Sequence, residues 1–146
     1  MLALACVLAG CSGSHKMAPP KNVEMTGDDD TKFNVASFEV KSGQLVTLTL
    51  KNIGELPKEA MAHNWVLLER GANAARLVQA GEEHPESDYI TAEYARRVLA
   101  KTKLLGPGES DSVTFTAPYD PGPYEYICTF PEHYGRGMKG TMTVVP

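Results

Sequence analysis

The sequence predicts an all-β protein, a β-sandwich with Greek-key connections. Apolar and polar residues alternate with a period of two in several short segments, which is the pattern of strands that bury one face. Segments rich in Gly, Pro, Asn and Asp lie between them, as expected for turns. The chain of 146 residues is long enough for one domain with its own core. These strands are therefore expected to pack as two sheets around that core.

The clearest alternation runs from Val46 to Leu50, where threonines separate the apolar residues. The same period recurs in four further segments, at Phe38 and Val40, Val113 and Phe115, Tyr124 and Tyr126, and Met142 and Val144. Turn signals separate the segments at Asn52-Ile53-Gly54, Gly106-Pro107-Gly108 and Asp120-Pro121-Gly122-Pro123. Each alternating segment is therefore interpreted as a half-buried strand.

One segment breaks the two-residue period. Ile90, Tyr94 and Val98 recur at four-residue spacing, as apolar residues do on the buried side of a helix. Ser87 or the aspartate after it can cap the start of such a helix. We predict one short helical excursion around residues 88–101, between strands of the sandwich.

The start of the chain is typical of an export signal. Residues 2–10 form an apolar run that is too short to cross a bilayer, which takes about 20 residues. The run Leu8-Ala9-Gly10-Cys11 resembles the lipobox of bacterial lipoproteins, in which cleavage leaves an acylated cysteine at the N-terminus. This resemblance implies a signal peptide at 1–10 and lipid attachment at Cys11. It also implies a place in the bacterial cell envelope, on the periplasmic or extracellular side. A plain secretory signal and a buried apolar strand are the alternatives.

The next residues and the overall charge add two expectations. Residues 11–30 are rich in Gly, Ser, Pro, Lys and Asp, which predicts a flexible tether from the lipid to a domain at 31–146. The chain has 14 basic and 18 acidic residues, a formal net charge of −4, and so no broad cationic surface. We expect a monomer that binds no nucleic acid.

The candidate functional residues lie near the C-terminal end. If Cys6 leaves with the signal and Cys11 carries lipid, Cys128 is the one thiol left in the domain and has no partner for a disulfide. His133 and Met138 follow it on the same predicted loop. A thiol, an imidazole and a thioether are donors that suit soft or borderline metal ions.

Copper is the metal that this donor set favours. A thiolate and two imidazoles in a plane, with a weak axial methionine, are typical of copper sites in electron transfer. His63 is the candidate for the second imidazole, because His15 lies in the predicted tether and His84 in a polar loop. A zinc site is the alternative, although zinc favours a fourth strong ligand where this chain has a thioether. Each residue alone also has an ordinary interpretation as part of a buried core.

Two segments resemble the metal-binding segments of the cupredoxins, the blue copper proteins. Met61-Ala62-His63-Asn64-Trp65 is similar to the azurin segment that carries the first His ligand. Cys128-Thr129-Phe130-Pro131, followed by His133, is similar to the azurin ligand loop. The four residues between His133 and Met138 agree with auracyanin, where azurin has three. From Thr31 onward the chain resembles the auracyanin and azurin branch of that family.

The resemblance implies one type 1 copper ion. Its ligands are two imidazoles, a thiolate and a thioether, those of His63, His133, Cys128 and Met138. The carbonyl oxygen of Ala62 is expected as a distant fifth contact. Asn64 and Thr129 are expected beside the ligands, with Asn64 joining the two ligand loops through hydrogen bonds.

The implied function is transfer of one electron between redox partners at a membrane surface. No enzymatic activity is expected, because four protein ligands leave no open position for a substrate. His133 is expected near the surface between Phe130, Pro131 and Tyr134, an apolar patch suited to brief docking. A cytochrome or a membrane oxidoreductase complex is the expected kind of partner. The alternative is an envelope copper-binding protein for storage or delivery. A detached domain of a multicopper oxidase or nitrite reductase would require a second copper site or a partner domain.

Overall fold

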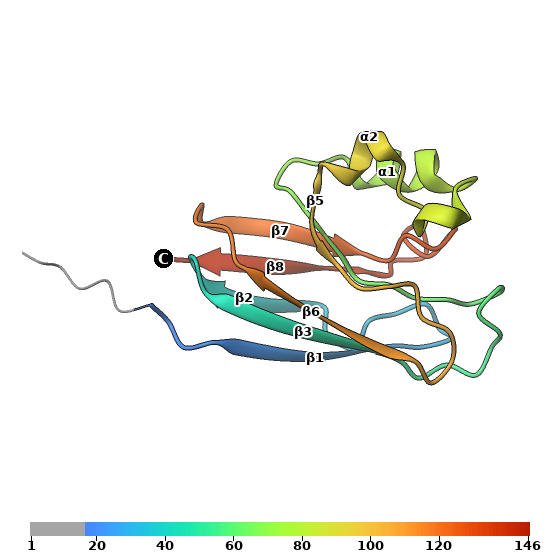
Figure 1. The fold of residues 1–146 in the computed structure, drawn as a ribbon, viewed down its shortest axis with the longest axis horizontal. Helices are drawn as coiled ribbons and strands as arrows, with labels where there is room; N and C mark the ends of the chain where they lie inside the picture. Colours follow the sequence, from blue (N-terminus) through green and yellow to red (C-terminus); the bar gives the residue numbers. More distant parts are fainter. Residues whose placement is uncertain (1–16) are drawn as a thin grey trace, which may run out of the picture.

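The protein folds as two β-sheets packed face to face (Figure 1). The computed structural model describes residues 17–146. The smaller sheet has the order β1 (Lys21–Gly27), β3 (Leu45–Asn52) and β6 (Ser110–Thr116). The larger sheet has the order β2 (Ser37–Lys41), β8 (Lys139–Val145), β7 (Gly122–Ile127), β4 (Val66–Leu68) and β5 (Val98–Lys101). The predicted β-sandwich is confirmed.

The domain begins earlier than the sequence pattern predicts. Strand β1 pairs in parallel with β3 and buries Val23 and Met25 in the core. The predicted tether at 11–30 is therefore wrong from Lys21 onward. The strand is hard to detect in the sequence because only these two of its side chains are large, apolar and buried. The predicted signal peptide at 1–10 and lipid attachment at Cys11 lie outside the described residues and stay predictions. Across residues 17–146, no helix is long and apolar enough to cross a membrane.

Aromatic rings fill the space between the sheets. Trp65 and Tyr126 are fully buried, with ring centroids 5.8 Å apart, and Phe115 of β6 packs on Trp65 at 5.7 Å. The Tyr126 hydroxyl donates a hydrogen bond to the carbonyl of Val35 at 2.6 Å. The strands predicted from the two-residue period in β3, β6, β7 and β8 are confirmed.

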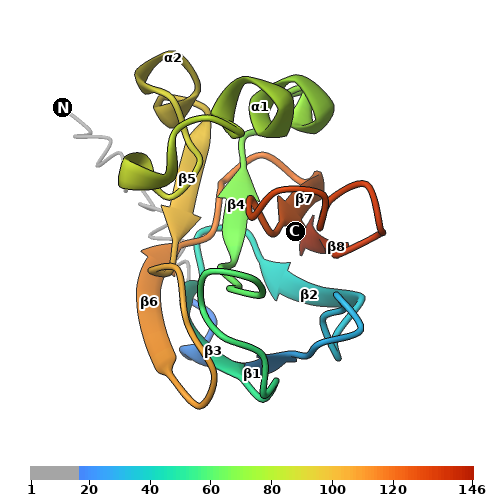
Figure 2. The same ribbon diagram turned by 90° about the vertical axis from the view of Figure 1, so that its right-hand side faces the viewer.

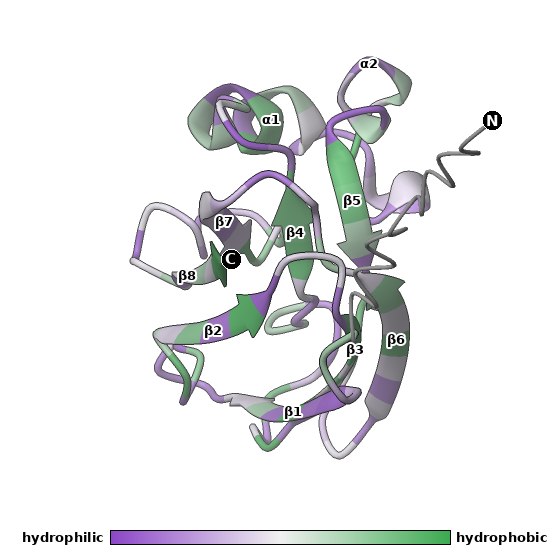
Figure 3. Ribbon diagram, turned by 90° about the vertical axis from the view of Figure 1, so that its left-hand side faces the viewer, coloured by the Kyte–Doolittle hydropathy of each residue, from purple (hydrophilic) through white to green (hydrophobic). Residues whose placement is uncertain are grey.

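Strand β4 is buried on both faces. Leu67 packs in the core between the sheets, whereas Val66 and Leu68 pack with Leu77 of helix α1 (Ala74–Gly81) on the outer side. Figure 2 shows the helices on the side of the larger sheet that faces away from the smaller sheet. In Figure 3, β4 is coloured as hydrophobic, which agrees with a strand enclosed from both sides.

The helical excursion differs from its prediction in extent and position. Only α2 (Ala92–Ala95) is an α-helix within residues 88–101, and the end of that range is strand β5. Tyr94 and Val98 do contact the same outer cluster as Ile90, but Val98 reaches it from a strand. The four-residue spacing of these apolar residues therefore reflects packing in one cluster and not a continuous helix. Helix α1 was not predicted, although its cap, Asn73, accepts a hydrogen bond from the amide of Arg76 at 3.0 Å.

Replacement of Met25 tests whether β1 belongs to the core. Met25→Ala removes a fully buried side chain and is expected to lower the free energy of unfolding by about 2–5 kcal/mol. Glu24→Ala, at the exposed neighbouring position, is the control and is expected to change it by less than about 0.5 kcal/mol. Urea unfolding followed by the fluorescence of Trp65 measures both. Equal, small effects would show that β1 is not part of the core.

Candidate metal centre

Three predicted metal ligands lie together at one end of the sandwich. The donor atoms of His63, Cys128 and His133 lie within 4.8 Å of one another, and all three residues are buried. Cys128 follows the last residue of β7, at the opposite end of the molecule from the start of β1 (Figure 1). His63 lies shortly before β4, which is the neighbour of β7 in the sheet. Antiparallel pairing places Val66 opposite Ile127, so the start of β4 meets the end of β7.

The segment from Cys128 to Met138 folds back on itself. The amide of Cys128 donates to the carbonyl of Met138 at 3.1 Å, and the amide of Met138 donates to the carbonyl of His133 at 2.9 Å. Gly137 has a φ of 95°, which glycine adopts without a steric penalty. These bonds bring the last donor of the loop back beside the first.

The imidazoles are arranged as metal ligands rather than as ordinary core residues. Both ring nitrogens of His63 are buried, and neither has a well-formed hydrogen bond among residues 17–146; the backbone of Asp28 is the polar group that faces the ring. Leaving such a group unpaired costs about 1–3 kcal/mol, so a bound cation that accepts a lone pair would remove part of this penalty. The His63 and His133 ring centroids lie 5.0 Å apart, and Cys128 Sγ lies 3.5 Å from His133 Nδ1. The donor set therefore fits a metal ion.

Burial sets the protonation states of these donors. Desolvation lowers the pKa of His133 to about 4, with smaller effects of His63 and Arg136 in the same direction. Desolvation also lowers the pKa of His63, which Asp28 and Asp29 partly oppose. Both imidazoles are thus neutral at pH 7, with lone pairs available to a metal. Burial raises the pKa of the Cys128 thiol to about 11, so a bound cation is needed to make it a thiolate.

Met138 and Ala62 complete the surroundings of the three donors. Met138 is fully buried, and a Cβ placed on Gly27 would lie 2.9 Å from Met138 Cε and 3.0 Å from His63 Cδ2. Glycine at the end of β1 therefore leaves the room that these two side chains occupy. The carbonyl oxygen of Ala62 lies 4.0 Å from Cys128 Sγ. The structure thus places the predicted thioether and carbonyl beside the site.

Asn64 and Thr129 join the two ligand segments, as predicted for Asn64. The side-chain oxygen of Asn64 accepts from the amide of Thr129 at 2.9 Å, and its Nδ2 donates to the Thr129 hydroxyl at 2.7 Å. Both residues are buried, so these bonds are shielded from competing water. They fix the segment of His63 against the segment of Cys128.

The predicted docking patch is only partly assembled. Phe130 packs on His133 with ring centroids 4.8 Å apart, and Pro131 lies beside them. They line a hollow of about 240 Å³ that also includes Ala60 and Met61, which the sequence analysis did not select. Tyr134 does not line this hollow. Its ring packs with the outer cluster beneath α1, and Lys139 Nζ lies 4.7 Å from its centre.

Comparison with known proteins assigns the chain to a family and agrees with its fold. The sequence model of the copper binding proteins of the plastocyanin/azurin family matches residues 21–145. The chain belongs to this family. It is 40% identical over 132 residues to an azurin of Bordetella pertussis, covering 88% of this chain and 87% of the azurin. It is 38% identical over 130 residues to auracyanin-B of Chloroflexus aurantiacus, covering 88% of this chain but only 54% of that relative's length.

Solved structures agree with this assignment to the plastocyanin/azurin family. Auracyanin A of Chloroflexus aurantiacus has a TM-score of 0.75 at 35% identity, covering 86% of this chain and 99% of that one. An auracyanin of Roseiflexus castenholzii has a TM-score of 0.73 at 35% identity, covering 86% and 97%. The predicted resemblance to auracyanins and azurins is confirmed, and the donor set fits one type 1 copper ion.

Replacement of Asn64 tests the link between the ligand segments. Asn64→Ala leaves the buried amide and hydroxyl of Thr129 without these partners, and is expected to lower the free energy of unfolding of the metal-free protein by about 1–3 kcal/mol. Asn22→Ala, an exposed asparagine on β1, is the control with an expected change below about 0.5 kcal/mol. Chemical unfolding measures both. If Asn64→Ala behaves like the control, the link does not stabilise the fold.

Proposed function

We propose that this member of the plastocyanin/azurin family carries single electrons between redox proteins at the surface of the bacterial cell envelope, on its periplasmic or extracellular side. The observation that carries the proposal is the closed donor set of two neutral imidazoles, a buried thiol and a buried thioether. A closed set leaves no coordination position for a substrate, which favours a carrier over an enzyme. A relative, the auracyanin of Roseiflexus castenholzii, is known in a dithionite-reduced form, which supports a redox role.

The residues of this chain perform three tasks in such a carrier. Copper, when bound, supplies a centre that exists as Cu(I) or Cu(II). Cys128 provides the thiolate, and His63 and His133 provide neutral nitrogen donors. The hydrogen bonds of Asn64 and the enclosed strand β4 hold these donors in place. A donor set that moves little between oxidation states keeps the barrier to electron transfer low.

Electron exchange with a partner is assigned to the hollow beside His133. The ring of His133 is only 3% exposed, but it lines this hollow together with Phe130, Pro131 and Met61. Glu132 and Arg136, which form an ion pair of 2.8 Å, lie at its edge. An apolar hollow with charges at its rim suits brief docking that depends on salt concentration. A cytochrome or a membrane oxidoreductase complex is the proposed kind of partner.

The proposed lipid anchor is consistent with the positions of β1 and the metal site at opposite ends of the domain. Strand β1 starts at the end of the sandwich opposite to Cys128 (Figure 1). A chain attached to a membrane through Cys11 can therefore present its metal end to a partner in the surrounding medium. This part of the proposal is tested by the mass of the processed N-terminal peptide, which would include an acyl group.

The visible spectrum tests the copper centre. The full chain loaded with Cu(II) is expected to show an intense visible band that disappears with ascorbate and returns on oxidation. Cys128→Ser is expected to lose the band, because the donor set then contains no thiolate. Absorption spectra through repeated redox cycles measure both. A colourless wild-type protein that binds one metal ion would contradict the proposal and favour copper storage or delivery, or a zinc site.

A charge placed in the hollow tests the docking surface. Met61→Glu adds a carboxylate beside His133 without changing a ligand, and is expected to slow electron exchange with a soluble c-type cytochrome about tenfold. Tyr119→Glu adds the same charge to an exposed residue before the start of β7, at the far end, and is expected to leave the rate unchanged. Stopped-flow absorbance measures the rates. Equal rates for both variants would place docking elsewhere.

A further inference from the structure

A strained turn outside the ligand loops contacts the metal centre. Asp88 and Tyr89 follow the 3-10 turn Pro85–Ser87, and both have left-handed backbone, with φ of 54° and 61°. Residues other than glycine adopt this conformation rarely, and it persists where the surroundings hold it in place. Four contacts of this turn hold it in place, and two of them reach the segment of Cys128.

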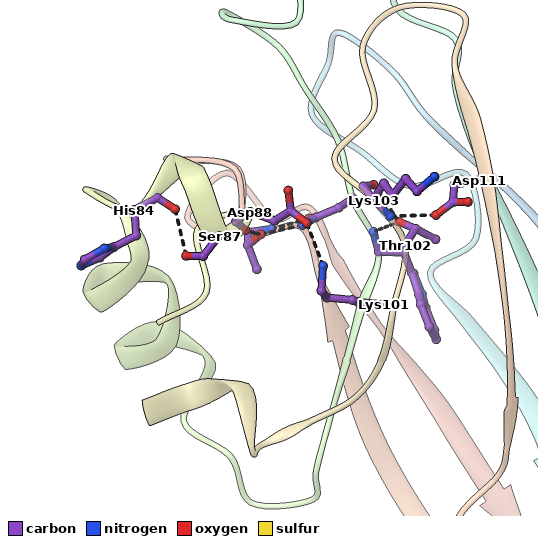
Figure 4. A network of polar contacts seen from close by, with 10 residues as sticks. His84, Ser87, Asp88, Lys101, Thr102, Lys103 and Asp111 are labelled. Carbon is purple, nitrogen blue, oxygen red and sulfur yellow. Dashed lines mark hydrogen bonds and ion pairs between the residues drawn. The ribbon is translucent and has the colours of Figure 1, made fainter. Parts of the chain in front are cut away.

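The first two contacts fasten the turn to the outer face of the sandwich. The carboxylate of Asp88 pairs with Lys101 Nζ at 2.7 Å, and Figure 4 shows this side chain extending from β5 to Asp88. The carbonyl of Tyr89 lies so close to Gly81 that a Cβ there would be 1.8 Å from its oxygen. The turn is thus held between strand β5 and the end of helix α1.

The third contact joins the turn to the ligand loop. The Thr129 hydroxyl donates to the backbone carbonyl of Asp88 at 2.7 Å. A hydroxyl has one proton, so the oxygen of Thr129 is left to accept from Asn64 Nδ2. The carbonyl of Asp88 therefore takes the one proton of the Thr129 hydroxyl and holds the residue that bonds the two ligand segments together. The ring of Tyr89 also meets Phe130 edge to face, with centroids 5.5 Å apart.

These contacts act on the residues that adjoin the Cys128 sulfur. The backbone N–H groups of Asn64 and Phe130 donate hydrogen bonds to the Cys128 sulfur, and such donors stabilise negative charge on their acceptor. Asn64 is bonded to Thr129, and Phe130 is its neighbour in the chain. Movement of Thr129 would therefore move both amides relative to the sulfur.

We propose that Asp88, held by Lys101, is a positioning residue that fixes the amides around the Cys128 sulfur and thereby raises the reduction potential of the copper centre. The inference rests on the copper site proposed above. Hydrogen bonding around the cysteine sulfur is one of the factors that set the potential of such sites. Donors to the sulfur favour the reduced state, in which the sulfur carries more negative charge. Loosening the turn is expected to lower the potential.

Two variants that change charge in opposite directions separate positioning from a simple field effect. Asp88→Asn removes a negative charge and keeps a residue that tolerates left-handed backbone, whereas Lys101→Met removes a positive charge. Positioning predicts that both variants lower the potential. A field effect alone predicts that Asp88→Asn raises it and Lys101→Met lowers it. Voltammetry of the copper-loaded full chain decides between them.

Arg97→Met and Lys101→Arg are the controls. Arg97 forms a comparable ion pair with Glu69 at 3.1 Å, on the same side of the sandwich but without a contact to Thr129. Its replacement is expected to leave the potential closer to that of the wild type than Lys101→Met does. Lys101→Arg keeps a cation beside Asp88 and is expected to restore the wild-type potential.

Amide hydrogen exchange in the metal-free protein provides a readout that does not need copper. The Thr129 amide is expected to exchange up to about fivefold faster in Asp88→Asn and Lys101→Met, the upper end for loss of an exposed ion pair. Arg97→Met is expected to leave it unchanged. A higher potential in Asp88→Asn, or unchanged exchange in both variants, would overturn the inference. If the copper-loaded wild-type protein shows no visible band, the copper proposal is rejected instead. The exchange rates of the metal-free protein do not depend on that proposal.

Discussion

The metal centre depends on a pair of hydrogen bonds between Asn64 and Thr129, because these bonds join segments that are far apart in the sequence. The order of strands in the larger sheet brings these two segments together. β4 and β7 run antiparallel as neighbours, so the residues before one strand lie beside the residues after the other. The aromatic core and the cluster under α1 then enclose β4 from both sides. The donors thus lie beside a strand that is packed on both faces, which holds their positions.

Burial gives the same site its chemical character. It keeps both imidazoles neutral, and it holds the thiol protonated until a cation arrives. A pocket of this kind attracts a metal that favours sulfur and nitrogen over oxygen. The turn at Asp88 supports the site from outside the set of ligands, because its backbone carbonyl accepts the hydrogen bond of the Thr129 hydroxyl. Support for the centre therefore comes from residues that never contact the metal.

The strands and the donors could be predicted where their residues form a regular pattern in the sequence. The prediction failed where a contact leaves no such pattern. Alternation along β3 was detectable because one face is apolar throughout, whereas β1 buries only Val23 and Met25 as large apolar side chains. The donors were recognisable because thiol, imidazole and thioether occur in one order on one loop. The four-residue spacing of Tyr94 and Val98 resembled that of a helix because both side chains pack in the same cluster, although Val98 lies in strand β5. Asp88 could not be found, because its contact with Thr129 uses the backbone, which has no residue-specific signature.

The parallel pairing of β8 with β2 has a consequence for the order of assembly. β8 places Thr141 opposite Ser37, so the last strand of the chain completes a sheet that begins near its start. The same strand follows Met138 directly, and its pairing with β7 draws that residue back toward Cys128. Until β8 has paired with both β2 and β7, the larger sheet is incomplete and Met138 lacks the bond that holds it beside Cys128. Pairing between segments far apart in the sequence therefore completes the set of donors, and a chain with local structure alone cannot hold a metal in the final geometry.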